Sequence, residues 1–364
     1  MQISQENKET YIFYSFLLVS GFILYWLIRE AYLYGAILVV FYVTYQKIVR
    51  NGIRFVEGKG RGVLITGCDT GFGHYLALRL WQNGFTVFAG CYLPDDEGAK
   101  SLQRKDSETL QVLKLDVTKD NHVEKALKHV QENLPQNGLW AVVNNAAINY
   151  LCDIEFCSLD LMRRVEDVNY YGMVRITKAF IPLLRKSKGR IINVTSVKGR
   201  IALPADVCYT TTKWAGEAFS DILRREMKRF GIKVVIVEPG NFGGITGMLN
   251  DKNIERVVTA LEESWQNASD EIKAAYGRKY IDDEIEGLKS ASRTSAKFIE
   301  PVINAMHDAV ANERPEYRYL VNGGTKPAVD WYCLCARMNE ILPEGFVDLF
   351  IEKTSPLPPV KKRV

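Results

Sequence analysis

The chain has 364 residues, enough for one large domain with attachments or for two ordinary domains, and 47% of them are hydrophobic. Its 47 basic and 43 acidic residues give a net charge of +4, which is too small and too scattered to favour nucleic-acid binding. Seven cysteines without metal-ligand spacing, with only four histidines, favour a reducing compartment and predict no metal site.

Two apolar runs near the N-terminus depart from a water-soluble composition. Residues 11–28 form an uncharged run about as long as a bilayer core is thick, and residues 31–45 continue it after Arg29 and Glu30. Two short spans in a hairpin, or one span followed by an interfacial helix, both fit this pattern. We therefore expect residues 1–55 to form a membrane anchor. The basic residues that follow it favour a cytosolic location for the rest of the chain.

From residue 62 onward, short β-branched runs alternate with longer helical patterns, which is typical of a parallel sheet covered by helices on both faces. One helical pattern places Val123, Ala126 and Val130 on a single apolar stripe. The sequence therefore predicts an α/β, doubly wound fold of the Rossmann type, whose ligands bind at the carboxyl ends of the strands. The seven expected strands are 62–66, 86–91, 111–115, 140–145, 190–195, 233–238 and 317–321.

The alternation of strands and helices stops between the last two expected strands. Residues 240–315 are mainly helical and charged, and we expect this insertion to cover the ligand crevice of a catalytic domain at 56–325. Residues 326–364 then follow as an apolar helix and a basic tail. The apolar stripe of that helix fits packing against the domain or contact with a membrane. Lys361 and Lys362 fit a dilysine signal for the endoplasmic reticulum or a solvated tail.

A glycine-rich turn, with Gly67, Gly71 and Gly73, follows the first expected strand and opens the first expected helix. Glycines at such a junction let the backbone approach a pyrophosphate, whose charge then meets the helix N-terminus. The turn therefore predicts a dinucleotide site.

Tyr209 and Lys213 are four residues apart, which places the phenol and the amine on one face of a helix. The pair alone also fits two ordinary side chains of an amphipathic helix that have no catalytic role. Ser196 precedes Tyr209 by 13 residues and ends a strand that points to the same crevice.

Five separated motifs have the same order and spacing as those of one superfamily: Gly67-x-x-x-Gly71-x-Gly73, Asn144-Asn145-Ala146, Ser196, Tyr209-x-x-x-Lys213 and Pro239-Gly240. Together they resemble the short-chain dehydrogenase/reductase superfamily. Within it, the chain looks similar to the branch that holds membrane-bound 17-beta-hydroxysteroid dehydrogenases, retinol dehydrogenases and 3-hydroxybutyrate dehydrogenase. The resemblance implies an NAD(P)-dependent oxidoreductase that acts on CH–OH donors. It also implies a homodimer that pairs through the helices carrying Asn169 and Tyr209.

The resemblance implies four catalytic residues. Tyr209 would exchange the alcohol proton, Ser196 would orient the substrate oxygen, and Asn169 would help relay protons toward Lys213. Lys213 would favour the phenolate and bind the nicotinamide ribose, because a neighbouring ammonium lowers the pKa of a phenol from its usual value of about 10.

The same resemblance implies the cofactor site. NAD is favoured over NADP, because no basic residue follows the second expected strand until Lys100 and because Asp69 would repel a 2′-phosphate. Two departures from the family pattern are Ala147, where glycine is usual, and a threonine delayed to Thr246. The implied cofactor-binding residues are Gly67, Asp69, Gly71, Phe72, Gly73, Asp116, Asn144, Ala146, Tyr209, Lys213, Pro239 and Gly240.

A membrane anchor suits a substrate that partitions into lipid. We therefore expect a membrane-anchored oxidoreductase of a lipophilic secondary or retinoid alcohol, with a steroid favoured, in the endoplasmic reticulum membrane. One alternative is (R)-3-hydroxybutyrate dehydrogenase in a mitochondrial membrane. The other is a catalytically silent membrane scaffold with the same fold.

Overall fold

The computed structural model describes residues 5–51, 54–105, 107–293, 295–324, 330–354 and 358. The chain divides into two compact units, Met1–Arg54 and Phe55–Val364, and each unit is described by itself.

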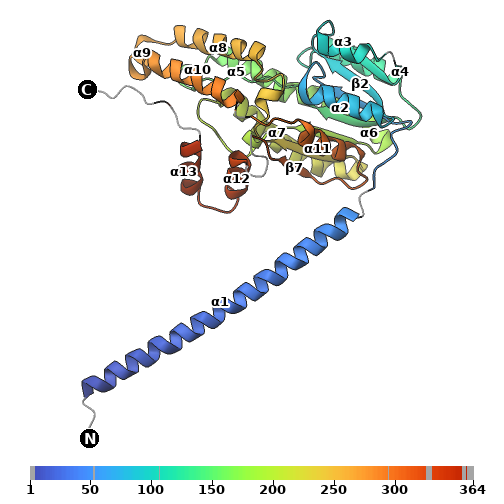
Figure 1. Ribbon diagram of the computed structural model, residues 1–364. Coiled ribbons are helices and arrows are strands. Elements are labelled where there is room, and N and C mark those ends of the chain that lie inside the picture. Colours follow the sequence, from blue (N-terminus) through green and yellow to red (C-terminus); the bar gives the residue numbers. More distant parts are fainter. Residues whose placement is uncertain are drawn as a thin grey trace. The chain divides into compact units, whose positions relative to one another are not determined.

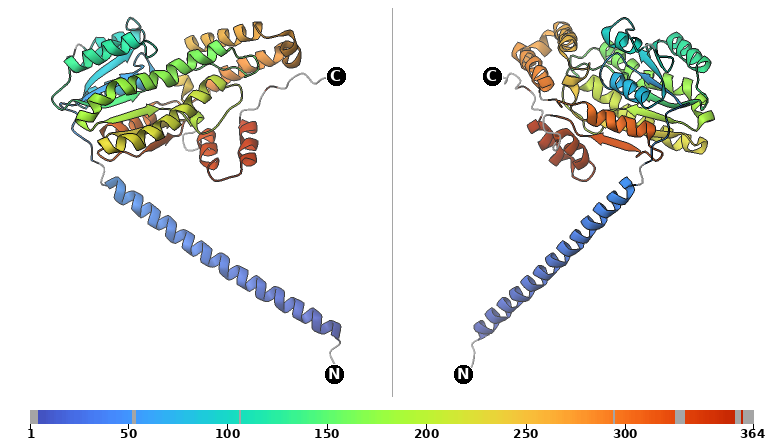
Figure 2. Two further views of the ribbon diagram at one scale, coloured as in Figure 1. Left: turned by 180° about the vertical axis from the view of Figure 1, so that it is seen from behind. Right: turned by 45° about the vertical axis from the view of Figure 1, so that its right-hand side comes forward.

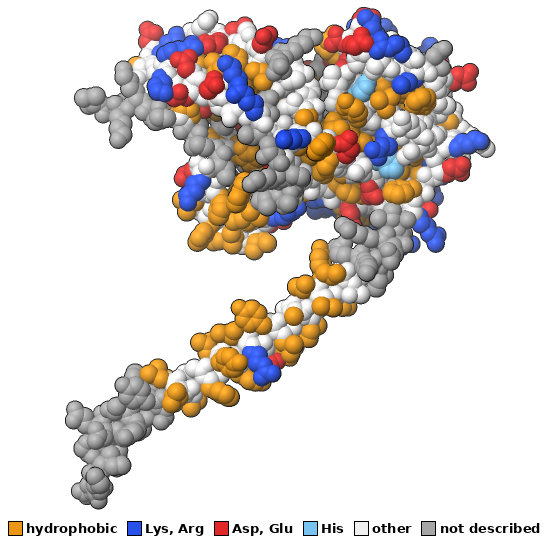
Figure 3. Space-filling model, viewed as in Figure 1, with side chains coloured by type: hydrophobic (Ala, Val, Ile, Leu, Met, Phe, Trp, Pro, Cys, Tyr) orange, Lys and Arg blue, Asp and Glu red, His pale blue; other side chains and the backbone are white. Residues whose placement is uncertain are grey.

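The first unit contains one continuous helix, α1 (Gln5–Asn51), in which Phe16–Tyr45 is long and apolar enough to cross a membrane. These 30 residues correspond to about 45 Å of helix, and hydrophobic side chains are exposed along it (Figure 3). Of the two arrangements that the sequence left open, the hairpin of two short spans is excluded, because Arg29 and Glu30 lie inside one continuous helix and do not end it. Both are good helix formers, so their charge interrupts the apolar pattern without breaking the backbone.

The second unit is built on a seven-stranded parallel sheet with the strand order β3-β2-β1-β4-β5-β6-β7 (Figure 1). This confirms the predicted doubly wound fold. The inner strands are mainly apolar and buried because helices cover both of their faces, whereas the edge strands β3 and β7 are only partly buried. Their bounds are β1 Gly62–Thr66, β2 Thr86–Cys91, β3 Leu110–Lys114, β4 Leu139–Asn144, β5 Arg190–Val194, β6 Lys233–Pro239 and β7 Arg318–Val321.

Helices cover the sheet on both faces, as the two views of Figure 2 show. On β1, Val63 and Ile65 join one core while Leu64 joins the other, because successive side chains of a strand point to opposite faces. The first core lies under α2 (Gly71–Gln82), α3 (Glu97–Gln103) and α11 (Glu300–Ala311), and the second under α4 (Asp120–Glu132), α6 (Gly172–Ser187) and α7 (Val207–Met227).

Three helices lie between β6 and α11: α8 (Asp251–Gln266), α9 (Asp270–Tyr276) and α10 (Arg278–Arg293). They pack against the segment that follows β4, where Leu261 of α8 and Ile281 of α10 share a core with Cys152 and Phe156. The helix α11 falls inside the expected insertion, yet its residues belong to the sheet core. Of the described helices in the expected insertion, α8, α9 and α10 therefore lie outside the two sheet cores.

Two helices close the described part of the C-terminal region, α12 (Trp331–Met338) and α13 (Glu344–Thr354). Cys333 and Cys335 of α12 and Val347 of α13 pack with Val197 and Ile201, just after β5. Their outer side stays apolar (Figure 3), with Ile341 81% and Phe346 59% exposed. The apolar residues of α12 and α13 therefore pack against the domain on one side and are exposed on the other side. Lys361 and Lys362 lie outside the described residues.

Candidate active site

The turn between β1 and α2 has a backbone that requires glycine. Gly67 and Gly71 have φ values of +70° and +62°, a region that side chains disfavour. A Cβ at Gly73 would collide with the carbonyl oxygen of Gly67, so α2 approaches the turn more closely than any other residue would allow. The Asn145 amide fixes the turn by donating to the carbonyl oxygens of Thr66 (2.8 Å) and Gly67 (3.0 Å). The result is a cradle of backbone atoms in front of the N-terminus of α2.

Asp69 of this turn fastens it to the end of β2. Its carboxylate accepts hydrogen bonds from the backbone N–H groups of Tyr92 (2.9 Å) and Leu93 (2.7 Å). The negative charge therefore lies at the carboxyl end of β2, where a parallel sheet of this kind receives the adenosine ribose. The Phe72 ring packs edge-on against the Phe242 ring, with the two ring centroids 5.8 Å apart.

Asp116, Asn144 and Ala146 lie at the carboxyl ends of β3 and β4. Asp116 accepts hydrogen bonds from the backbone N–H and the hydroxyl of Thr118. Its carboxylate therefore stabilises the backbone turn that follows β3. Asn144 is buried and donates to Thr177 and Asn193, while its own side-chain oxygen has no hydrogen-bond partner within the protein. The backbone N–H of Ala146 binds the Thr66 hydroxyl at 3.0 Å.

The structure brings Ser196, Tyr209 and Lys213 together. Tyr209 and Lys213 lie on the first turns of α7, and the Lys213 Nζ is 5.2 Å from the centroid of the Tyr209 ring. That amine donates to the carbonyl oxygen of Val194, the last residue of β5 (3.0 Å). Ser196 follows β5, and its hydroxyl donates to the Pro239 carbonyl at 3.4 Å. All three side chains are buried.

The pKa values at this site follow from burial. Burial raises the pKa of the Tyr209 phenol, the charge of Asp206 raises it further, and a hydrogen bond with Ser196 lowers it. Burial also lowers the pKa of Lys213 to about 8. The direction for Tyr209 is opposite to the expected one, because the loss of solvation and the charge of Asp206 outweigh the hydrogen bond with Ser196. The protein alone therefore holds Tyr209 as a neutral phenol.

Asn169 lies in a short π-helical segment, Asp167–Tyr171, between α5 (Leu159–Glu166) and α6. Its amide accepts from the backbone N–H of Ile148 (2.8 Å) and donates to the carbonyl oxygen of the same residue (2.9 Å). It also donates to the Thr212 hydroxyl, one residue before Lys213. The side chain thus ties the segment after β4 to α7, which makes it a positioning group in this structure.

Pro239 ends β6, and Gly240 continues toward the cofactor cradle. A Cβ at Gly240 would collide with the Asp330 carboxylate, which accounts for the glycine. Beyond it, Thr246 and Gly247 lie against Thr70 and Gly71 of the glycine turn. The delayed threonine therefore lies against the glycine turn.

Sequence reasoning missed an ion pair beside Tyr209. The Lys198 amine lies 2.5 Å from the Asp206 carboxylate, which is 1% exposed, and 5.6 Å from the centroid of the Tyr209 ring. Asp206 lies three residues before Tyr209, but a single carboxylate before a helix is indistinguishable from an ordinary N-terminal residue. Thr66 and Asn145, which hold the turn, were also missed as individual residues.

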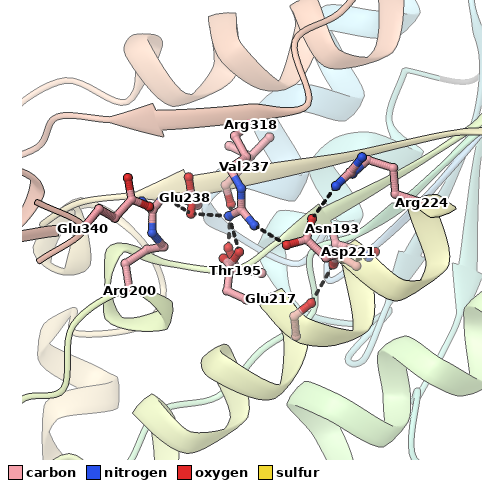
Figure 4. A network of polar contacts seen from close by, with 12 residues as sticks. Asn193, Thr195, Arg200, Glu217, Asp221, Arg224, Val237, Glu238, Arg318 and Glu340 are labelled. Carbon is pink, nitrogen blue, oxygen red and sulfur yellow. Dashed lines mark hydrogen bonds and ion pairs between the residues drawn. The ribbon is translucent and has the colours of Figure 1, made fainter. Parts of the chain in front are cut away.

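A network of charges lies one helical turn beyond Lys213 (Figure 4). Arg318 of β7 contacts Glu217 and Asp221 of α7 and Glu238 of β6, with Arg318–Asp221 at 2.9 Å and Arg318–Glu238 at 2.8 Å. Arg200, which follows β5, also pairs with Glu238 at 3.1 Å. The network locks α7, which carries Tyr209 and Lys213, to the last two strands of the sheet.

This geometry defines a dinucleotide-binding α/β protein with a buried Ser, Tyr and Lys site. The family described as short chain dehydrogenase matches residues 61–256. D-beta-hydroxybutyrate dehydrogenase, mitochondrial, of Mus musculus is 40% identical over 264 residues, which cover 71% of this chain and 76% of that protein. The chain therefore belongs to the short chain dehydrogenase family and is an oxidoreductase.

Other relatives have different names. Estradiol 17-beta-dehydrogenase 2 of Mus musculus is 37% identical over 297 residues, covering 80% of this chain and 74% of that protein. Retinol dehydrogenase 7 of Mus musculus is 37% identical over 264 residues, covering 72% and 81%. A short chain dehydrogenase/reductase from Burkholderia phymatum, crystallised in complex with NAD, has a TM-score of 0.60 at 18% identity, covering 84% of this chain and 99% of that one. This last likeness supports the fold.

Proposed function

We propose that the chain is a membrane-anchored oxidoreductase that interconverts a lipophilic secondary or retinoid alcohol and its carbonyl, with a steroid as the favoured substrate and a nicotinamide dinucleotide as the cofactor. The observation that carries the proposal is the buried group of Ser196, Tyr209 and Lys213 beside the glycine turn. A positioned acid–base group of this kind contributes about 10²- to 10⁴-fold to a proton transfer.

The protein's own groups divide the work of proton transfer. The Tyr209 oxygen takes the proton of the substrate hydroxyl, and the Ser196 hydroxyl holds the same substrate oxygen in place. The Lys213 amine is fixed by the Val194 carbonyl and stabilises the phenolate once it forms. Because burial raises the pKa of Tyr209, further positive charge is needed before the phenol releases its proton at neutral pH.

A bound nicotinamide would exchange the hydride with the carbinol carbon, and in its oxidised form it would supply that positive charge. The residues fit it, since Gly67, Gly71 and Gly73 leave no side chain in the cradle and Asn144 has an unpaired buried oxygen. NAD is favoured over NADP, because the Asp69 carboxylate at the end of β2 disfavours a 2′-phosphate.

The charges beside Tyr209 support a neutral substrate. The Lys198–Asp206 pair carries no net positive charge, and Asp206 acts on Tyr209 as a negative group. A substrate carboxylate placed there would find no unpaired cation, because the Lys198 amine is already held by Asp206. The apolar helix α1 and the uncovered apolar side of α12 and α13 support a substrate met at a lipid surface.

A second candidate, (R)-3-hydroxybutyrate dehydrogenase, is favoured by the 40% identity to the mouse enzyme of that activity. The pairing of Lys198 with Asp206 argues against it, because it leaves no free cation for the substrate carboxylate. The silent-scaffold alternative is disfavoured, because Ser196, Tyr209 and Lys213 are all present and close together.

The test is turnover by the full chain in phospholipid vesicles, with NAD and with NADP, on a steroid alcohol, retinol and 3-hydroxybutyrate. We expect reduced nicotinamide to form with NAD and a lipid alcohol. Tyr209→Phe should lower the rate at least ~10²-fold while dinucleotide binding persists. Tyr317→Phe, at an exposed tyrosine, is the matched control. Turnover confined to 3-hydroxybutyrate would favour the second candidate, and dinucleotide binding without any turnover would favour the scaffold.

The proposal includes a location and an assembly. We place the chain in the endoplasmic reticulum membrane with Phe55–Val364 in the cytosol, and the mitochondrial membrane is the alternative. We also propose a homodimer. Tyr171, Trp214 and Ile222, on or beside α6 and α7, are about half exposed and would be covered by a second copy. Membrane fractionation tests the compartment, and light scattering of the detergent-solubilised chain tests the dimer.

A further inference from the structure

Three thiols gather at the start of α7, beside the catalytic tyrosine. Cys152 lies in the segment after β4, Cys157 lies just before α5, and Cys208 directly precedes Tyr209. The Sγ atoms of Cys157 and Cys208 are 3.3 Å apart, and Cys157 also hydrogen-bonds Cys152. All three cysteines are free. Two sulfur atoms at this separation need to approach by little more than 1 Å to reach the disulfide bond length of about 2.0 Å.

The three thiols differ in their access to solvent. Cys152 and Cys208 are each 1% exposed, whereas Cys157 is only partly buried. Cys157 also lines a cavity of about 330 Å³ between the segment before α5 and the helices α8 and α9, with Ser158, Glu263 and Asn267 among its walls. A small oxidant such as hydrogen peroxide therefore reaches Cys157 first.

The thiols also differ in their reactivity. Hydrogen bonds from the thiols of Cys152 and Cys208 stabilise the Cys157 thiolate and lower the pKa of Cys157 to about 4, while the same contacts and burial raise the pKa of both neighbours. The thiolate is the form of cysteine that attacks peroxides and disulfides. Cys157 is thus the attacking sulfur and Cys208 the resolving one.

We propose that Cys157 and Cys208 form a reversible disulfide in the presence of a peroxide, and that this disulfide switches the enzyme off. The Cys157 thiolate attacks one oxygen of hydrogen peroxide, the O–O bond breaks, and a sulfenic acid and hydroxide form. The Cys208 sulfur then attacks the Cys157 sulfur. The S–O bond breaks, and the departing oxygen leaves as water with the Cys208 proton. The two sulfurs lose two electrons, and the peroxide becomes two waters once the hydroxide regains the proton that Cys157 had released.

The effect on turnover follows from the position of Cys208. Its side chain packs with Tyr150 and Val165, and the next residue in the same helical turn is Tyr209. Drawing the two sulfurs together displaces the first turn of α7, and a displacement of about 1 Å at a catalytic group can lower a rate ~10²-fold. This consequence rests on the proposed function, whereas the formation of the disulfide does not.

The experiment treats the full chain in phospholipid vesicles with hydrogen peroxide and maps its peptides without reduction. We expect a peptide pair joined through Cys157 and Cys208, a loss of turnover of about 10-fold or more, and recovery with dithiothreitol. Cys157→Ser and Cys208→Ser should both keep their activity under peroxide. Cys333→Ser, at a buried thiol of α12, is the matched control and should stay as sensitive as the unaltered chain.

The outcomes separate the two proposals. Absence of a Cys157–Cys208 peptide pair overturns the disulfide, and a Cys152–Cys157 pair overturns the assignment of the resolving thiol. A disulfide that leaves turnover unchanged overturns the switch. Where no alcohol is turned over, hydrogen exchange of the peptide that starts α7 supplies the readout: altered protection on oxidation supports the displacement, and unaltered protection overturns it.

Discussion

Glu217 is a buried carboxylate one helical turn after Lys213. Burial raises its pKa to about 7, the nearby charge of Glu238 adds to this effect, and Arg318 opposes it (Figure 4). The carboxyl group therefore exchanges its proton near neutral pH although it touches neither the phenol nor the cradle. We expect its titration to affect the stability of α7, which carries Tyr209 and Lys213.

The stability of the protein should depend on pH through Glu217. Below the ordinary glutamate pKa of 4.5 both folded and unfolded chains hold the proton, so the contribution is complete. As pH rises toward about 7 the unfolded chain releases the proton first, and the free energy of unfolding falls. We expect Glu217→Gln to reduce this fall, measured by urea unfolding at about pH 5 and about pH 7. Glu226→Gln, at an exposed site on the same helix, is the control. An unchanged pH dependence in Glu217→Gln would contradict the assignment.

At this scale the sequence predicts residues whose role is set by local spacing. Tyr209, Lys213 and Ser196 come together as expected, because a helix turn and a strand end fix their positions. The roles of Asp206 and Glu217 could not be predicted. Each depends on a cation supplied by another element, Lys198 before α7 in one case and Arg318 on β7 in the other.

Among the secondary-structure elements, the junction of β1 and α2 leaves no room for a side chain at Gly73. We expect Gly73→Ala to lower the stability by about 1–3 kcal/mol and to weaken dinucleotide binding, because the new Cβ would force the backbone of the turn to move. Gly287→Ala, in α10 with nothing within 4 Å of the added carbon, should instead stabilise by up to about 1 kcal/mol. Thermal unfolding and dinucleotide titration measure both variants. Equal effects at the two positions would show that close approach is not the cause.

The bounds of the strands could be predicted from the sequence, but the surface against which each helix packs could not. Apolar runs buried on both faces gave strand ends within a residue of those observed, such as Gly62–Thr66 and Thr86–Cys91. The helix α11 was grouped with the insertion because composition cannot tell which helix faces a sheet. Only the packing of Val302 and Met306 on α2 and the strands shows that α11 covers the sheet. In α1, the charges of Arg29 and Glu30 interrupt the apolar pattern, but the helix continues through both residues.

For the whole molecule, the two units should be separable. Within the described residues, none of the hydrophobic cores includes a side chain that precedes Phe55. We therefore expect a chain that begins at Phe55 to keep its unfolding midpoint and its dinucleotide binding while it loses co-flotation with phospholipid vesicles. Thermal unfolding and flotation test this. Flotation that persists would mean that the apolar side of α12 and α13 suffices, and a lowered midpoint would mean that α1 supports the fold.

The order of the strands places the proposed cofactor-binding and substrate-binding residues at different strands of the sheet. Asp69 and the glycine turn lie between β1 and β2, whereas Ser196, Tyr209 and Asp206 follow β5. Under the proposed function, we expect mutations beside β1 and β2 to change which redox carrier is used and mutations after β5 to change which alcohol is accepted. Enzymes with this architecture can thus acquire new substrates while staying coupled to the same cellular pool of reducing power.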